Sequence, residues 1–378
     1  MLAKYLITQI TQLDLAGDVT TVSGNAIDIS LGNSSNTKGL IINQTKKDGE
    51  VSGTNYGIVV ANGSGGSAIL NVAGNVTGSG TDGIYVNNGR SAKDIIVNQT
   101  ETSSSVTGRN YGINAVNAGT GSTNIDISGS VTSTAGRGIY VNQGGNTKDI
   151  IINQSKIDGG ITGSSFGIDA INSGTGKTQL DLAGDVKAIS GTAISVNVNN
   201  SANTGDLTIR QTKVDGGIQG NNAGIIVANS GTGLTQLNLA GDVTTTAGNA
   251  INVSLNNSSN TQGLLINQTK KNGEVSGTNY GIVVANGSGG SAILNIAGNV
   301  TGTGRNGVYV NNGGYAKDIN INQTETDSAI SGRNYGIEAR NSGTGSTVIN
   351  LAGSVNGTSD EGDTGESEGT PQATFSVR

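Results

Sequence analysis

Carboxylates are the only side chains in this sequence that can act as general acids or bases near neutral pH. The chain has no histidine and no cysteine, which excludes imidazole chemistry, thiolate nucleophiles and cysteine-ligated zinc. Asp14, Asp126 and Asp181 recur at one position of a repeat, but other copies carry asparagine, as at Asn71 and Asn238. Glycosidase or lyase chemistry needs a local cluster of carboxylates with Arg, Lys or calcium, and the sequence shows none. We therefore predict that the chain is not an enzyme and holds no cofactor.

A metal site is not predicted either. The calcium-binding nonapeptide pattern GGxGxDxUx is absent from the sequence. Aspartates at the shared repeat position are expected roughly 10 Å apart in the fold derived below, which is too far to chelate one ion.

The net charge of −6 is concentrated near the C-terminus, and residues 1–355 carry only about −2 of it. That body has no basic stripe for nucleic-acid phosphates and no polybasic cluster for anionic lipids. No apolar run has the length of a membrane span. We expect no nucleic-acid binding and no direct membrane insertion of this segment, and we expect residues 356–378 to form an acidic disordered tail or linker.

The elements that position these residues come from a repeat. The segment AGDV around Gly17 returns around six later glycines at spacings of 55 or 57 residues: Gly74, Gly129, Gly184, Gly241, Gly298 and Gly353. Residues 11–80 also match residues 235–304 at 59 of 70 positions, which indicates duplication of a four-repeat block. A fixed period of this size is typical of architectures whose units bury their apolar faces against their neighbours.

Each repeat divides into two similar halves, such as residues 69–89 and 93–119. Both halves alternate apolar and polar residues, and clusters of Gly, Asn, Ser and Thr separate these segments, which indicates half-buried strands joined by tight corners. We predict an all-β, right-handed parallel β-helix (β-solenoid) of about thirteen coils of about 27 residues over residues 1–355. Helical periodicity is absent, and the strands are too short and rich in glycine for propeller blades.

The phase of one strand type follows from residues 207–210, because Thr208 and Arg210 must face water and Leu207 and Ile209 must then face the core. In this phase an apolar stripe faces outward, formed by Ile41, Ile96, Ile151 and Leu265. An exposed apolar stripe is a candidate partner-contact surface. The alternative is that a neighbouring loop folds over it.

Tyrosines form a second outward column, at Tyr85, Tyr140 and Tyr309. Such tyrosines could stack on sugar rings or contact a partner. The alternative is an ordinary solvated face, because equivalent positions carry Asp28, Ser195 and Asn252. Further aromatic residues precede corner glycines, and we expect them to stack at the corners and cap the core edge; these are Tyr56, Tyr111, Phe166, Tyr280 and Tyr335.

Asparagines are expected to form structural ladders at the strand ends, because stacked amides can hydrogen-bond from coil to coil. The predicted members are Asn62, Asn87, Asn117, Asn142, Asn172, Asn229, Asn286, Asn311 and Asn341. N-x-[ST] glycosylation motifs also recur, at Asn43, Asn75, Asn98, Asn153, Asn267, Asn299 and Asn322. Their regularity follows from the repeat, and glycosylation at them stays an open possibility.

The recurring patterns Gly-Ile-x-Val-x-Asn and Leu-x-Leu-Ala-Gly-x-Val, without cysteine, resemble the passenger domains of bacterial autotransporter adhesins and related haemagglutinin-like β-helices over residues 11–355. The resemblance implies export across the outer membrane of a Gram-negative bacterium and a role in adhesion, aggregation or biofilm formation at the cell surface. Partners would be glycans or proteins of host or bacterial surfaces, or further copies of the chain. Residues 1–10 lack the features of a signal peptide, and the repeat begins at Thr11, so we expect the sequence to be a fragment.

Two other functional classes stay open from the sequence. One is a polysaccharide-processing β-helix such as a phage tailspike or lyase. The other is a self-assembling extracellular fibre subunit, because the open end of a β-helix exposes unpaired strand edges.

Overall fold

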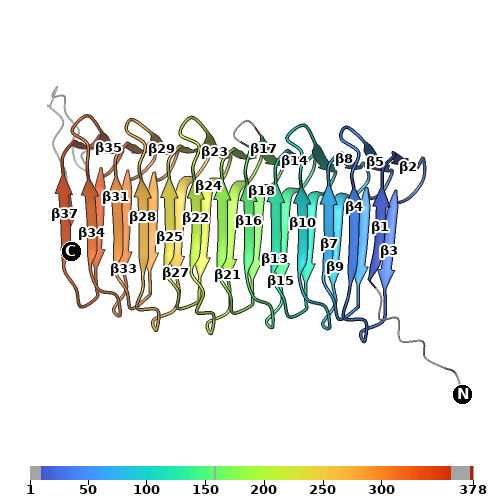
Figure 1. Ribbon diagram of the computed structural model, residues 1–378. Coiled ribbons are helices and arrows are strands. Elements are labelled where there is room, and N and C mark those ends of the chain that lie inside the picture. The colour runs from blue at the N-terminus through green and yellow to red at the C-terminus, as the bar shows by residue number, and fades with distance from the viewer. Residues whose placement is uncertain (1–9, 157–158, 359–374, 378) are drawn as a thin grey trace, which may run out of the picture. The chain divides into compact units, whose positions relative to one another are not determined.

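The computed structural model describes residues 10–156, 159–358 and 375–377 (Figure 1). These residues form strands, turns and bends, and none of them is helical. The chain is a parallel β-solenoid of about 12 turns with about 28 residues per turn, which confirms the predicted fold class.

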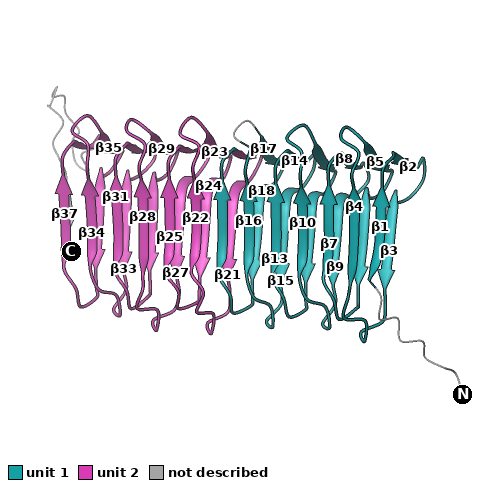
Figure 2. Ribbon diagram, in the orientation of Figure 1, with its two compact units in different colours: residues 1–184 teal, residues 185–378 magenta. Residues whose placement is uncertain are grey.

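The chain consists of two compact units, residues 1–184 and residues 185–378 (Figure 2). In each unit, successive turns contribute strands to three parallel sheets, named A, B and C here. The strands alternate A, B, C along the chain.

The first unit contains nineteen strands, β1 to β19. Sheet A consists of β1 (Thr11–Leu15), β4 (Leu40–Gln44), β7 (Ala68–Val72), β10 (Ile95–Gln99), β13 (Thr123–Ile127), β16 (Ile150–Gln154) and β19 (Thr178–Leu182). Sheet B consists of β2 (Val19–Thr20), β5 (Glu50–Gly53), β8 (Asn75–Gly78), β11 (Ser105–Gly108), β14 (Ser130–Ser133) and β17 (Gly160–Gly163). Sheet C consists of β3 (Ile27–Leu31), β6 (Ile58–Asn62), β9 (Asp82–Asn88), β12 (Tyr111–Asn117), β15 (Arg137–Gln143) and β18 (Phe166–Asn172).

The second unit repeats this arrangement. Its sheet A consists of β22 (Leu207–Gln211), β25 (Thr235–Leu239), β28 (Leu264–Gln268), β31 (Ala292–Ile296), β34 (Ile319–Gln323) and β37 (Thr347–Leu351). Its sheet B consists of β20 (Asp185–Ala188), β23 (Gly217–Gly220), β26 (Asp242–Thr245), β29 (Glu274–Gly277), β32 (Asn299–Gly302), β35 (Ala329–Gly332) and β38 (Ser354–Gly357). Its sheet C consists of β21 (Thr192–Val198), β24 (Ala223–Asn229), β27 (Asn249–Leu255), β30 (Ile282–Asn286), β33 (Val308–Asn312), β36 (Ile337–Asn341) and β39 (Phe375–Val377).

Equivalent residues of successive turns lie in register. Leu40 pairs with Ala68, and Ala68 pairs with Ile95. Because side chains alternate between the two faces of a strand, this register arranges equivalent side chains in columns along each unit. Every column is therefore either a core column or a surface column.

The core consists of inward columns of aliphatic residues, chiefly isoleucine, valine, leucine and alanine. Leu207 and Ile209 are fully buried, whereas Thr208 is half-buried and Arg210 is exposed, so the predicted phase is confirmed. The predicted inward column exposes 1% or less of each residue: Leu40, Ile95, Ile150, Leu207, Leu264 and Ile319. Burial of one such side chain contributes roughly 1.5–3 kcal/mol.

Two kinds of corner join sheet A to sheet B and alternate along the chain. A short corner with the sequence AG[DN] follows β1 and β7, and its counterpart after β13 reads Ser128-Gly129-Ser130; a longer loop follows β4, β10 and β16. The longer loops project at the top of the view in Figure 1. Of the predicted acidic tail, residues 359–374 and 378 lie outside the described residues, and β39 pairs in parallel with β36.

Candidate functional site

The predicted apolar stripe lies on the outward face of sheet A. Ile41 and Ile96 are half-buried and point away from the core, as predicted. Ile69 lies between them in register and makes the stripe continuous over three turns. In Figure 1 the strands of sheet A lie in front, with the long loops above them.

The stripe continues less regularly in both units. Ile151 of the first unit is half-buried and outward, and so is Leu265 of the second unit, whose neighbour in register is Ile293. Asn124 separates Ile96 from Ile151. Its buried Oδ1 has no hydrogen-bond partner, one of two such atoms among the described residues. That these columns contact a partner stays a prediction.

The predicted tyrosine column belongs to a larger pattern on the outward face of sheet C. In the first unit, Tyr85 and Tyr140 lie two turns apart in one column. Tyr111 and Phe166 lie two turns apart in the neighbouring column, one turn out of step with the tyrosines. Tyr56 occupies the second column's position one turn before β9. The five aromatic side chains therefore alternate between two columns over five consecutive turns, and we name them the aromatic zigzag.

Members of the zigzag pack against one another in pairs. The rings of Tyr56 and Tyr85 are stacked with centroids 5.9 Å apart, and those of Tyr111 and Tyr140 are stacked at 5.5 Å. All five residues of the zigzag are half-buried. Burial is the largest cause of the raised pKa of Tyr85 and of Tyr140. Two of the corner aromatic residues, Tyr56 and Tyr111, thus stack as predicted, and their partners are the tyrosines of the next turn. Phe166 instead contacts the guanidinium of Arg137.

Val59 and four polar residues occupy the remaining five positions of the two columns, and the polar residues form two diagonal pairs. Asn114 Nδ2 donates a hydrogen bond to Asp82 Oδ2 at 3.0 Å. Arg137 Nε donates to Asp169 Oδ2 at 2.7 Å, and Arg137 Nη1 donates to the Tyr111 hydroxyl at 3.0 Å. Burial raises the pKa of Asp82 to about 6, against the lowering effect of the hydrogen bond from Asn114.

The guanidinium of Arg137 lies among aromatic rings. Its Cζ atom is 4.8 Å from the ring centroid of Tyr140, 5.2 Å from that of Phe166 and 5.6 Å from that of Tyr111. These distances are typical of cation–π contacts. The arginine therefore joins three members of the zigzag.

A shorter version of the pattern lies on sheet C of the second unit. Tyr309 lies 5.9 Å from Tyr280, ring centroid to ring centroid. Asn306 Nδ2 donates to Glu338 Oε2 at 2.7 Å. Asn306 and Glu338 follow Asp82 and Asn114 by 224 residues, so the duplication has kept the carboxylate–amide pair and exchanged its ends. Arg305 contacts the Tyr280 ring here.

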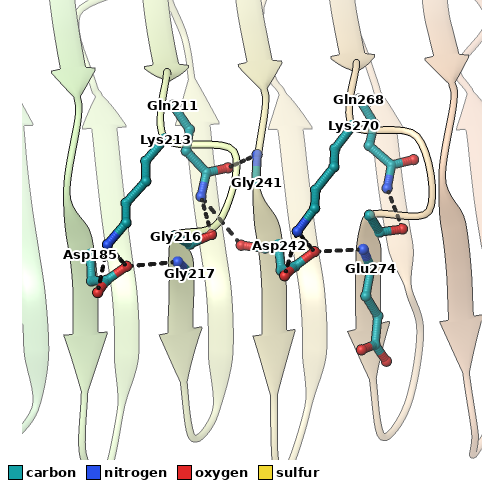
Figure 3. Close-up of polar contacts among 11 residues, drawn as sticks. Asp185, Gln211, Lys213, Gly216, Gly217, Gly241, Asp242, Gln268, Lys270 and Glu274 are labelled. Atoms are coloured by element: carbon teal, nitrogen blue, oxygen red, sulfur yellow. Dashed lines mark hydrogen bonds and ion pairs between the residues drawn. The ribbon is translucent and has the colours of Figure 1, made fainter. Parts of the chain in front are cut away.

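A buried glutamine fixes each long corner loop, and the sequence reasoning missed it. Gln211 Nε2 donates to the carbonyl of Gly216 at 3.2 Å, and the N–H of Gly241 donates to Gln211 Oε1 at 3.1 Å (Figure 3). A Cβ atom at position 241 would lie 2.6 Å from Gln211 Nε2, so the glycine of the short corner is required by this approach. Equivalent glutamines make the same two bonds, to a carbonyl five residues on and from a glycine 30 residues on: Gln44, Gln99, Gln154, Gln268 and Gln323.

An aspartate of the short corner holds the same loop from the preceding turn. Lys270 Nζ lies 3.0 Å from Asp242 Oδ2, and the N–H of Glu274 donates to Asp242 Oδ1 at 2.8 Å (Figure 3). Asp185 makes the corresponding contacts with Lys213 and Gly217. Asp18 does so with Lys46 and Glu50, and the bond from Lys46 is the largest cause of its lowered pKa.

The identity of the corner residue follows that of the loop residue 26 to 28 positions later. Asp18, Asp185 and Asp242 precede lysines, whereas Asn75 and Asn299 precede Glu101 and Glu325. Asn75 accepts the backbone N–H and the hydroxyl of Ser105, and Asn299 accepts the backbone N–H of Ala329. An amide there avoids placing two carboxylates together. Five of the six pairs in the chain are therefore matched for charge, and the sixth is Ser130 with Lys156, whose ammonium donates to the Thr102 carbonyl.

Each side chain of the Asn-Gln-Thr motif has a structural partner. Asn267 Nδ2 donates to Asn238 Oδ1 at 2.8 Å, Gln268 forms the loop contacts described above, and Thr269 Oγ1 donates to the Leu239 carbonyl at 3.3 Å. The asparagine belongs to an amide ladder on the outside of sheet A, in which Asn295 donates to Asn267 in turn. The recurrence of this N-x-[ST] motif therefore has a structural cause.

The predicted strand-end ladder is wrong by one residue in three turns. Asn87 and Asn142 are half-buried on the outward face and Asn311 is exposed, whereas their neighbours Asn88, Gln143 and Asn312 are buried. Strict alternation from the inward Val86 gives this result, because Asn87 must then point outward. Two of the remaining members form the expected amide bond between turns: Asn62 Nδ2 donates to Asn88 Oδ1 and Asn286 Nδ2 to Asn312 Oδ1, each at 3.0 Å. Asn172 and Asn229 instead donate to the hydroxyl of a threonine six residues on.

Acidic side chains do not gather into a metal site in the part of the chain that the structure describes. A shallow polar depression lies among turns of the second unit, at Thr204, Asp206 and Gln262. The carboxylate of Asp206 accepts the N–H of Leu234 at 2.9 Å. None of the described segments forms a helix with the length and hydropathy needed to cross a bilayer.

Comparison of the chain with family models, with curated proteins and with solved structures finds no match. Function is therefore argued from the surfaces of the solenoid itself.

Proposed function

We propose that this chain is a non-enzymatic structural and adhesive stalk of an autotransporter-type adhesin, exposed at the surface of a Gram-negative bacterium. The observation that carries the proposal is the repeated use of polar side chains as clamps between turns. Gln211 and Gln268 hold equivalent loops by equivalent bonds. Because identical buried clamps hold successive turns, the solenoid presents the same surface features on many turns. Such a surface suits adhesion through many weak contacts better than binding of a ligand in a single pocket.

The use of the carboxylates supports a non-enzymatic role. Asp242 is engaged by Lys270 and by a backbone N–H, and Asp169 by Arg137. The buried Asp82 is engaged by an amide. A general acid and a general base must face the substrate bond that is cleaved. These three carboxylates are instead bonded to other residues of the fold.

The outward columns are the proposed contact surfaces. Apolar side chains at Ile41, Ile69 and Ile96 and the aromatic zigzag repeat with the turns. Surface glycans or proteins of host or bacterial cells are the proposed partners, together with self-association.

Cell-surface display tests the adhesive role. The chain would be displayed on a non-adherent bacterial strain, and cells retained on epithelial monolayers, on abiotic surfaces and on one another would be counted. A displayed protein of similar size and charge without a solenoid serves as the control. We expect retention above this control, and retention equal to the control would refute the proposal.

Two further measurements separate the other classes. Incubation with a polysaccharide panel would yield new reducing ends or unsaturated products from a lyase or glycosidase, and either product would overturn the non-enzymatic role. Negative-stain images over a concentration series would show filaments if the chain were a fibre subunit. We expect neither products nor filaments.

A further inference from the structure

We infer that the aromatic zigzag of the first unit is a binding site for an extended, uncharged, β-linked polysaccharide. The inference rests on the proposed adhesive function and names the class of ligand. It concerns Tyr56, Tyr85, Tyr111, Tyr140 and Phe166, together with the polar side chains between them.

The spacing of the zigzag carries the first step. Its members advance one turn at a time, and each turn of a parallel β-solenoid advances by roughly 4.8 Å. An extended β-linked glycan advances by a similar length per sugar and turns over with each sugar, so that successive rings present opposite faces and edges. Aromatic side chains that alternate between two columns, such as Tyr85 and Tyr111, match this alternation. Aromatic rings offer sugars a flat apolar surface next to a polar edge.

An unsatisfied acceptor within the zigzag carries the second step. Asn114 is 9% exposed and lies between Tyr85 and Tyr140 in register. Its Nδ2 donates to Asp82, but its buried Oδ1 has no hydrogen-bond partner. Buried acceptors are nearly always satisfied, because an unpaired one loses its hydration without compensation. Because this oxygen is buried, a sugar hydroxyl reaches it when the side chains of Tyr85 and Tyr140 separate on binding, and it then supplies the donor that the oxygen lacks.

The charges of the zigzag indicate which class of polymer it can bind. Arg137 and Asp169 neutralise each other at 2.7 Å, and Asp82 adds a carboxyl group with a pKa of about 6. The patch therefore offers no excess of cations to a polyanion such as nucleic acid or an acidic polysaccharide. A neutral glycan fits this balance.

Binding to defined oligosaccharides tests the inference on the full chain. Cellohexaose and chitohexaose are the β-linked probes, maltohexaose is the α-linked control, and polygalacturonate is the polyanion. The chain has 9 tyrosines and no tryptophan, and four of the tyrosines belong to the zigzag, so tyrosine fluorescence includes a signal from the site, and isothermal titration calorimetry supplies the Kd. We expect at least one β-linked hexamer to bind, its trimer to bind about tenfold more weakly, and neither control to bind.

Variants tie the binding to the zigzag. Tyr85→Ala and Tyr140→Ala should each weaken hexamer binding about five- to tenfold, and Tyr85→Phe should retain it because the ring is kept. Tyr315→Ala is the matched control, since Tyr315 is 73% exposed and lies outside the zigzag. A thermal melt of each variant checks that it is folded.

Several results would overturn the inference. These are the absence of binding by both β-linked hexamers, equal binding of maltohexaose, binding of polygalacturonate alone, or an unchanged Kd in the folded Tyr85→Ala and Tyr140→Ala variants. Cell retention that persists when no oligosaccharide binds would refute this ligand and leave the adhesive role standing. Loss of retention with oligosaccharide binding intact would refute the adhesive role and leave the site standing.

Discussion

Asn114 donates its side-chain amide to the carboxylate of Asp82 at 3.0 Å, across neighbouring turns of sheet C. Both residues are buried, at 9% and 3% exposure. In the duplicated block the same two positions carry Asn306 and Glu338, again joined by one hydrogen bond but with the carboxylate on the later turn. The fold thus demands one acid and one amide at this place and accepts either order, which is the behaviour of a packing pair.

The first prediction concerns the pH dependence of stability. The pKa of Asp82 is about 6 in the folded state against an ordinary 3.8, so folding favours its protonated form. Its contribution to stability is therefore fully present below pH 3.8 and is lost as the pH rises through about 6. Asp82→Asn should raise the free energy of unfolding at pH 7 by at most about 3 kcal/mol and change it little at pH 3.5. Urea denaturation followed by circular dichroism from pH 3.5 to 8 measures the difference.

A mirror variant provides the control for this prediction. Asn306→Asp places a second carboxylate beside Glu338, and we expect it to destabilise the protein at pH 7 by about 1–3 kcal/mol. Carboxylates elsewhere with a lowered pKa, such as Asp18, lose their stabilising contribution in acid, but they are common to all variants and cancel in the differences. A gain from Asp82→Asn that is independent of pH would show that burial of the charge is not the cause.

The second prediction concerns the glutamine clamp. Gln268→Ala removes the bond to the Gly273 carbonyl at 3.1 Å and leaves the Gly298 N–H without its acceptor. We expect a loss of about 1–3 kcal/mol in the free energy of unfolding and faster hydrogen exchange at Gly298. Gln236→Ala is the matched control, because Gln236 is half-buried on the outward face and bonds only Asn238 there; it should cost less than about 0.5 kcal/mol. Equal losses from the two variants would contradict a clamping role.

Much of this fold follows from the sequence, because period-2 alternation and a fixed repeat length specify both the strand faces and their register. Residues 207–210 fixed the phase of sheet A, since one charged side chain, Arg210, admits only one orientation. The prediction that Asn87 belongs to the strand-end ladder was wrong. It followed the recurrence of asparagine, although the inward Val86 already required Asn87 to point outward. The asparagine chosen from the repeat therefore lies one residue before the asparagine that is buried.

The clamps and the zigzag were harder to predict for physical reasons. Gln268 stands in a motif, Asn-Gln-Thr, that is also a glycosylation signal. The glutamine itself recurs in all six copies, even where its neighbours change to Arg210 or Ser155, and this was a usable sign of burial. The zigzag joins corner and strand positions of different turns, such as Tyr111 and Tyr140, and their contact depends on how far each corner carries the chain. The spacing in the sequence shows which residues share each column, but it does not show how close the two columns lie to each other.

The third prediction concerns charge matching at the corners. Lys270→Glu alone brings a carboxylate toward Asp242, which now pairs with Lys270 at 3.0 Å, and it should cost about 1 kcal/mol. Adding Asp242→Asn recreates the natural combination of Asn299 and Glu325, and we expect at least half of the loss to be recovered. A double-mutant cycle measured by urea denaturation gives the coupling, which should shrink in 1 M salt because screening is strong there. Additive effects of the two substitutions would contradict the match.

The fourth prediction concerns Arg137 at the centre of the aromatic zigzag. Arg137→Ala leaves the carboxylate of Asp169, 7% exposed as a residue, without the guanidinium at 2.7 Å and removes a cation that contacts three rings. We expect a loss of about 2–4 kcal/mol in the free energy of unfolding. Arg137→Lys should recover only part of it, because an ammonium lacks the planar group that stacks on aromatic rings while bonding a carboxylate. Arg109→Ala changes an exposed arginine and should stay within about 0.5 kcal/mol of the parent. If Arg137→Ala changed the free energy of unfolding as little as that control, Arg137 would not stabilise the fold, and the arrangement of the zigzag would depend on ring packing alone.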